Sequence, residues 1–199
     1  MTLERFTLQD LPATPWKNGG GTTREIVCWP PGSGLEDFWW RASVATIDAP
    51  GPFSAFEGVD RTILLLEGAG VLLAGEGFSH WLDTPHQPFD FSGDTPVECS
   101  LIGGTTTDFN LMSRRAHGRA ELRVLTDEPL DLPPAEHGLL LTLDGQYRID
   151  AGYQLQGRGL WWAREPHAWR LVPASRGARL LVVQWWPVAS EEAPDDFDV

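Results

Sequence analysis

The sequence contains little cysteine and no long apolar run. Its 199 residues include two cysteines, Cys28 and Cys99, which lie far apart and form no Cys-x-x-Cys pair. A disulfide framework is therefore excluded, and reduced thiols, as in the cytosol, are expected. Residues 1–6 lack the basic and apolar blocks of a secretion signal, and no apolar run approaches the ~18 residues of a membrane-spanning helix. We expect a soluble cytoplasmic protein without a membrane partner.

Basic residues are also scarce. Lys and Arg number 15 against 28 Asp and Glu, which gives a formal net charge of −13 and a sequence pI near 4.6. This balance argues against a nucleic-acid partner, because binding to a phosphate backbone depends on basic side chains. An anionic small molecule stays open, since the local field inside a pocket can oppose the net charge.

Helix-forming stretches are few as well. Sixteen prolines and 21 glycines leave little room for long helices, and the best helical candidate is a short connector within residues 110–125. Short apolar runs recur between clusters of Gly, Pro, Asp and Ser, which is typical of an all-β sandwich or barrel. These runs cover residues 42–47, 62–66, 97–102, 139–143 and 180–185.

The order of elements repeats once along the chain. An apolar run that ends in Glu67-Gly68 is echoed by one that ends in Asp144-Gly145, and each pair is a hairpin signal. A duplicated β module of about 80 residues fits two jelly-roll barrels, the architecture that includes cupins. We expect an N-terminal barrel with a ligand pocket over residues 1–115, a second barrel over 116–190 and an acidic disordered tail over 191–199.

Patterns that carry catalysis or bind metals are missing. The five histidines include no pair two residues apart on one strand, so the His-x-His arrangement of a metal site is absent. His86 and His167 follow prolines at corresponding places of the two halves, which favours a turn role for both. No serine stands in a Gly-x-Ser-x-Gly elbow, and residues 19–21 fit neither a P-loop nor a dinucleotide fingerprint. We expect no metal, no cofactor and no catalytic residue.

Three consecutive glycines, residues 19–21, stand in the least interchangeable stretch of the chain. Glycine permits positive φ and the close approach of other groups. Its neighbours can supply stacking, charge and hydrogen bonds to a small polar or anionic ligand. We expect this loop near the mouth of the first barrel; the alternative is a tight turn before a strand. The neighbours concerned are Trp16, Lys17, Asn18 and Thr22.

Two-residue periodicity places Arg61 on one face of its strand with Ile63 and Leu65. An arginine on the inward face of an apolar barrel requires an anion, and its planar fork suits a carboxylate or formate. The alternative is a salt bridge to Asp60 or Glu57 at the rim.

The same periodicity pairs Arg41 with Ser43 and Glu98 with Ser100 on two other strands. We expect Arg41, Ser43 and Glu98 to join Arg61 on one polar face. Large aromatic residues, which are also typical of a core, can wall such a pocket. They are Trp16, Phe53, Phe56 and Phe109.

Four separated motifs occur in order within the first 115 residues. They are residues 15–26 (PWKNGGGTTREI), 40–43 (WRAS), 52–56 (PFSAF) with Asp60-Arg61, and 108–112 (DFNLM). Together they resemble the HutD/Ves family. The resemblance implies a bicupin fold, an association with bacterial histidine utilisation, a pocket for formate or an N-formylglutamate-like ligand, and a modulatory role without an established reaction.

The combined expectation is an all-β bicupin that binds a small anionic carboxylate without a metal and modulates histidine utilisation. One alternative is a cupin enzyme acting on a small formylated acid, amide or sugar. Another is a protein-binding modulator that uses outward tryptophans from residues 161–162 and 185–186, although these also fit packing between barrels or in a homodimer. The candidate ligand-binding residues are Trp16, Lys17, Asn18, Thr22, Arg41, Ser43, Arg61, Glu98 and Phe109.

Overall fold

The computed structural model describes residues 2–150 and 153–188, and all regular elements in them are β-strands. No helix occurs in these ranges, and therefore none long and apolar enough to span a membrane. The expected connector helix within 110–125 is wrong, because strands Thr106–Arg114 (β11) and Gly118–Thr126 (β12) occupy this stretch. Both faces of β11 are buried, so its sequence lacks the alternation that marks a strand. The acidic tail, 191–199, lies outside the described residues.

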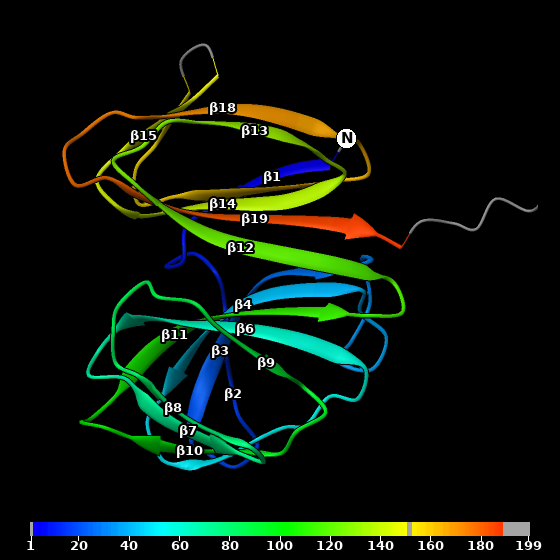
Figure 1. Cartoon of the computed structure of the whole chain (residues 1–199), viewed down its shortest axis with the longest axis vertical. Helices are drawn as coiled ribbons and strands as arrows, with labels where there is room; N and C mark the ends of the chain where they lie inside the picture. Colours follow the sequence, from blue (N-terminus) through cyan, green and yellow to red (C-terminus); the bar gives the residue numbers. More distant parts are fainter. Residues whose placement is uncertain (1, 151–152, 189–199) are drawn as a thin grey trace, which may run out of the picture.

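The N-terminal half is a six-stranded sheet facing a four-stranded sheet, and it forms the lower half of Figure 1. The larger sheet has the order β2 (Ala13–Pro15), β3 (Gly21–Trp29), β4 (Trp40–Ile47), β11, β6 (Val59–Glu67) and β9 (Phe89–Ser92). The smaller sheet has the order β5 (Gly51–Phe53), β10 (Val97–Leu101), β7 (Val71–Gly75) and β8 (Phe78–Leu82).

The C-terminal half pairs a five-stranded with a four-stranded sheet. The five-stranded sheet has the order β1 (Thr2–Phe6), β17 (Gly159–Ala163), β14 (His137–Asp144), β19 (Arg179–Pro187) and β12. The other has the order β13 (Leu130–Ala135), β18 (His167–Pro173), β15 (Tyr147–Ile149) and β16 (Tyr153–Leu155). The first strand of the chain thus lies in the second half, as Figure 1 shows, which the expected division at residue 115 did not foresee.

Eight strands of each half correspond in order, while β1, β2 and β3 have no counterpart in the described part of the chain. The order β4-β11-β6-β9 corresponds to β12-β19-β14-β17, and β5-β10-β7-β8 corresponds to β13-β18-β15-β16. The predicted all-β duplicated jelly roll is therefore confirmed. The four sheets are hydrogen-bonded separately among the described residues, so each half is an open two-sheet arrangement and not the closed barrel we expected.

Two details of the predicted repeat are wrong. Glu67-Gly68 and Asp144-Gly145 do not close hairpins, because each connects a strand of the larger sheet to a strand of the smaller one. The two glycines have φ of 95° and 63°, a conformation that lets the chain change direction there. His86 precedes β9, whereas His167 begins β18, the counterpart of β10, so these histidines are not at equivalent positions.

The largest apolar cluster lies between the two halves. The outer face of the six-stranded sheet, including Leu64 and Phe109, packs against Trp161 and Trp185 of the five-stranded sheet. Separate clusters fill the inside of each half. Trp161 and Trp185 point away from their own core and are buried between the halves, so they offer no exposed surface to a partner.

Candidate functional site

The candidate site is built around Arg61, whose side chain lies inside the N-terminal half. Arg61 shares its face of β6 with the core residues Ile63 and Leu65, as predicted, and it is 7% exposed. One guanidinium nitrogen, Nη1, donates to the carbonyl oxygen of Ser54 at 3.3 Å, while Nε has no acceptor. The guanidinium is therefore buried with hydrogen-bonding capacity left over.

Three phenylalanine rings surround this cation. The Cζ atom of Arg61 lies 5.4 Å from the ring centroid of Phe53, 5.7 Å from that of Phe56 and 4.9 Å from that of Phe91. Cation–π contacts of this kind offset part of the lost hydration. Phe53 and Phe56 lie where we expected aromatic walls. Phe91, opposite Arg61 on β9, was not predicted as part of the site.

Arg61 has no anionic partner among the described residues. The alternative rim salt bridge is wrong for Asp60, since that carboxylate pairs with Arg115 at 2.6 Å. Burial, followed by the like charge of Arg41, lowers the pKa of Arg61 to about 10. A buried and uncompensated charge is costly, so this position favours the binding of an anion.

Arg41 and Ser43 lie on the same inner face, as predicted. In the strand ladder Arg41 is opposite Met112, which is in turn opposite Arg61. Arg41 donates through Nε to Glu25 at 2.8 Å and through Nη1 to the Ser43 hydroxyl at 3.2 Å. Its charge is thus compensated by Glu25, a residue that sequence reasoning missed, and Arg61 is left as the unpaired cation.

Two further polar groups on β11 face the inside of this half and lack partners. Asp108 is fully buried, neither of its carboxylate oxygens is hydrogen-bonded, and burial raises its pKa to about 7. The Oδ1 atom of Asn110, between Ser43 and Ile63 in the ladder, is also unpartnered. Sequence reasoning chose Phe109 from this motif, although two-residue periodicity offered the signal for its neighbours.

Phe109 and Glu98 do not join the arginines. Phe109 packs in the cluster between the halves, on the opposite face of β11 from Asp108 and Asn110. Glu98 is exposed, while Val97 and Cys99 of the same strand face the core. The predicted alternation in β10 was right, but the charged face of this strand turns to solvent.

The glycine loop lies at the other end of the sheet. Gly21 is opposite Ile47 on β4. Arg41 lies on the same strand, six residues away from Ile47. At a strand rise of about 3.3 Å per residue, the separation is roughly 20 Å. The expectation that Lys17, Asn18 and Thr22 lie beside Arg61 at the barrel mouth is therefore wrong.

Local contacts explain the composition of this loop. Asn18 accepts the Gly20 N–H through Oδ1 at 3.0 Å, and Gly19 has a φ of 72°. Trp16 donates through its indole N–H to Thr23 at 2.8 Å and packs against the core of the N-terminal half. The stretch is a tightly hydrogen-bonded turn before β3, which was the alternative to a ligand-binding loop.

Gly21→Ala is expected to destabilise the protein more than Gly20→Ala. A Cβ at Gly21 would lie 2.2 Å from the carbonyl oxygen of Thr46, so β3 and β4 would have to separate, at a cost of about 1–3 kcal/mol. At Gly20 the nearest atom would be Asn18 Oδ1 at 3.4 Å, and the change should stay within about 0.5 kcal/mol. Urea unfolding measures both; equal losses would contradict the close approach at Gly21.

The C-terminal half has no counterpart of Arg61. The row Met112-Arg61-Phe91 in the first half corresponds to Gln184-Gly138-Trp162 in the second. A Cβ at Gly138 would meet the Trp162 ring at 2.4 Å, so the indole fills the space that the arginine takes in the first half. Of the two halves, only the N-terminal one therefore has a buried arginine at this position.

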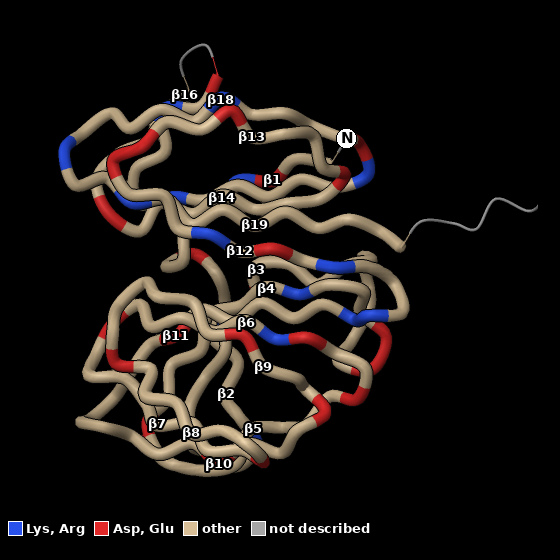
Figure 2. Tube along the Cα trace, in the orientation of Figure 1, with Lys and Arg blue, Asp and Glu red and all other residues tan. Residues whose placement is uncertain are grey.

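A cavity of about 500 Å³ touches Arg61 and Phe91. Its other walls come from β6, β9 and the edge strand β12 of the second half. Acidic and basic residues are interspersed along these strands, as the colours of Figure 2 show. The site thus borders the junction of the two halves.

Metal-ligating side chains do not converge in the part of the chain that the structure describes: no three His, Cys, Asp or Glu form a set that could hold a metal ion. His137 is enclosed by Trp29 and Trp185, and burial, followed by the charge of Arg164, lowers its pKa to about 4. His80 stacks on Phe89 at 3.7 Å between ring centroids. These two histidines serve in aromatic packing.

The HutD family model matches residues 8–181 of the chain. The chain belongs to the HutD family. It is 40% identical over 174 residues to Protein Ves of Cronobacter sakazakii, covering 86% of this chain and 93% of that protein. A 21.2 kDa protein in the hutC 3′ region of Pseudomonas putida is 38% identical over 160 residues, 80% of this chain and 84% of its own length.

Solved structures agree with this membership. HutD from Pseudomonas fluorescens SBW25, determined in a formate condition, superposes with a TM-score of 0.81 at 30% identity, covering 94% of this chain and 100% of that one. Oxalate decarboxylase of Bacillus subtilis superposes with a TM-score of 0.60 at 10% identity, covering 94% and 78%. The latter likeness concerns the fold, and the predicted bicupin architecture is confirmed.

Proposed function

We propose that this HutD family member binds a small carboxylate at Arg61 and modulates histidine utilisation in response to it. The observation that carries the proposal is a guanidinium that is 7% exposed, ringed by phenylalanines and without an anionic partner among the described residues. A bound anion would remove the cost of leaving this charge uncompensated.

The guanidinium of Arg61 and the rings around it favour a planar carboxylate as ligand. The guanidinium presents donors in one plane, which matches the two oxygens of a carboxylate, and charge-assisted hydrogen bonds are the stronger kind. Nη1 already donates to Ser54, and Nε is the buried donor that has no acceptor among the described residues. Formate is the smallest carboxylate.

The neighbouring groups favour an acid that also carries an amide. Asn110 Oδ1 needs a hydrogen-bond donor and lies on the same face as Arg61, two residue pairs away along the ladder. The formamide N–H of N-formylglutamate would supply this donor while one of its carboxylates binds Arg61. Asp108, two residues further along β11, has its pKa raised by burial to about 7 and can accept or donate a hydrogen bond at neutral pH.

The relatives support the biological setting. One is encoded in the hutC 3′ region of Pseudomonas putida, and HutD of Pseudomonas fluorescens was determined in a formate condition. A protein that binds N-formylglutamate or formate would sense how far histidine degradation has proceeded. The resemblance to the HutD/Ves family implies that such sensing restrains pathway expression.

Calorimetric titration of the ligand-free protein tests the ligand class. We expect N-formylglutamate to bind more tightly than formate, and glutamate at least tenfold more weakly than N-formylglutamate, because its ammonium group would approach Arg61 and Arg41. Formamide, which is neutral and nearly the shape of formate, is the matched control and should release no binding heat. Equal affinity for glutamate and N-formylglutamate, or no binding of either acid at millimolar concentration, would contradict the proposal.

A further inference from the structure

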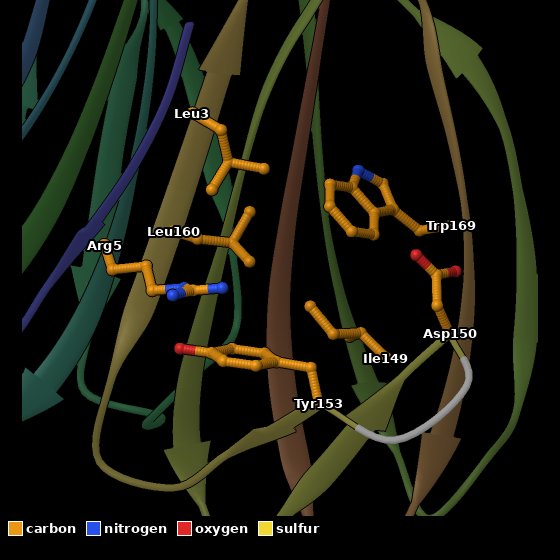
Figure 3. Close-up of a pocket in the computed structure, with 7 residues that line it drawn as sticks. All are labelled: Leu3, Arg5, Ile149, Asp150, Tyr153, Leu160 and Trp169. Atoms are coloured by element: carbon orange, nitrogen blue, oxygen red, sulfur yellow. The ribbon is translucent and has the colours of Figure 1, made fainter.

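A second cavity, of about 600 Å³, opens in the C-terminal half, remote from the arginines of the first half. Its walls come from strands β1, β15, β16, β17 and β18, and it lies over the core cluster of this half, with Arg5 and Asp150 exposed to solvent. Three apolar side chains form part of the wall (Figure 3), and they are Leu3, Ile149 and Leu160. The row that corresponds to Arg61 is filled by Trp162, so this cavity is not the repeated copy of that site.

The first strand of the chain supplies the cationic group of this cavity. Residues on β1 alternate, so Leu3 and Arg5 share the face that looks into the second half, and Arg5 is opposite Leu160 in the ladder. The Arg5 guanidinium stacks over the ring of Tyr153 at 4.1 Å from its centroid, as Figure 3 shows. No described carboxylate pairs with Arg5, so its donors are free to bind an anion.

Trp169 lines the same cavity, and its buried indole N–H has no acceptor in the part of the chain that the structure describes. Trp169 is 6% exposed, and its Nε1 atom has no hydrogen-bond partner among the described residues. Its ring is packed against Trp162 at 5.6 Å and His167 at 4.0 Å between centroids, so the indole is fixed in place. A buried donor without an acceptor lowers the stability of the folded protein, and a ligand atom that accepts its hydrogen bond would remove this cost.

Asp150 supplies an acceptor on the opposite wall from Arg5 (Figure 3). Its backbone has a φ of 48°, and its Oδ1 atom accepts the Arg170 N–H at 3.2 Å. The Oδ2 atom lies 3.8 Å from Nε2 of His167 and keeps capacity for another donor. The wall formed by Trp169 and Asp150 therefore offers one donor and one acceptor.

We infer that this cavity binds a small acid with an apolar or aromatic body, a carboxylate at one end and an amide-like group at the other. The carboxylate binds Arg5, and the body lies against Leu160 and Ile149. A carboxamide has an oxygen that accepts from Trp169 and an N–H that donates to Asp150. The stacked Arg5 and Tyr153 pair accommodates the planar end of such a ligand.

Titration with 4-carbamoylbenzoate tests the assignment, because benzoate and benzamide each lack one of the two groups. We expect 4-carbamoylbenzoate to bind at least tenfold more tightly than either control. In ¹⁵N-labelled protein its binding should shift the indole N–H resonance that Trp169→Phe removes. No binding at 10 mM, or equal affinity for all three compounds, would overturn the inference.

Variants separate this cavity from the Arg61 site. Arg5→Gln should weaken 4-carbamoylbenzoate at least tenfold and leave benzamide unchanged, whereas Arg148→Gln, an exposed change beside Ile149, should alter neither. Arg61→Gln should leave 4-carbamoylbenzoate binding intact. Loss of binding in Arg61→Gln, or full binding in Arg5→Gln, would contradict a site in the C-terminal half, while the proposed function at Arg61 would be unaffected.

Discussion

Arg61→Met is expected to stabilise the ligand-free protein and to abolish its stabilisation by carboxylates. Methionine keeps much of the apolar stem that packs among Phe53, Phe56 and Phe91 but removes a buried charge that has no anionic partner among the described residues. Replacing buried charge by apolar volume is often stabilising by about 1–4 kcal/mol. Urea unfolding without ligand should therefore give a higher free energy of unfolding for the variant than for the parent.

A carboxylate ligand should raise the free energy of unfolding of the parent but not that of Arg61→Met. For the parent, N-formylglutamate at about 100 times its Kd should add about 2.7 kcal/mol, while Arg61→Met should gain nothing. Arg41→Met is the matched control, since Arg41 is paired with Glu25 at 2.8 Å and its loss should destabilise the protein. Destabilisation of Arg61→Met by several kcal/mol would mean that Arg61 is compensated within the protein.

Asp108→Asn is expected to flatten the dependence of stability on pH. Burial raises the pKa of Asp108 to about 7 from its usual 3.8, so the folded state holds a proton that the unfolded state has released between these pH values. The stability that this proton contributes is present below the unfolded pKa and is lost as pH rises through 7. The parent should lose about 2–3 kcal/mol between pH 5 and pH 8 from this group alone.

The variant should retain that free energy at pH 8, because a neutral amide is never forced to ionise in the interior. Unfolding curves at pH 5, 6, 7 and 8 measure the slopes, and residues that titrate in both proteins cancel in the difference. Asp83→Asn, at an exposed position, should keep the slope of the parent. Parallel slopes for Asp108→Asn and the parent would show that Asp108 ionises freely in the folded protein.

Local periodicity was sufficient to predict much of the site. The alternation of Arg61, Ile63 and Leu65 determined which side chains of β6 face inward, and the same reasoning oriented Arg41 and Ser43. It worked because successive side chains of a strand point to opposite faces, whatever surrounds each face. One face meets the core of its own half, and the other meets the second half.

The remaining features depend on pairing between distant segments. Glu98 alternates with Val97 and Cys99 as predicted. Its side chain faces solvent because β10 joins the smaller sheet, and no local sequence pattern predicts which sheet a strand joins. The end of the sheet at which the glycine loop lies follows from the register of β3 on β4. The crossing of β1 into the second half, which brings Arg5 to the C-terminal cavity, depends on pairing with β17 across more than 150 residues.

The most direct test of carboxylate binding at Arg61 is a crystal structure of the protein soaked with N-formylglutamate. We predict a ligand carboxylate within hydrogen-bonding distance of the Arg61 guanidinium, among Phe53, Phe56 and Phe91, with the formamide N–H donating to Asn110. Ligand density at another place, with no anion at Arg61, would contradict the account.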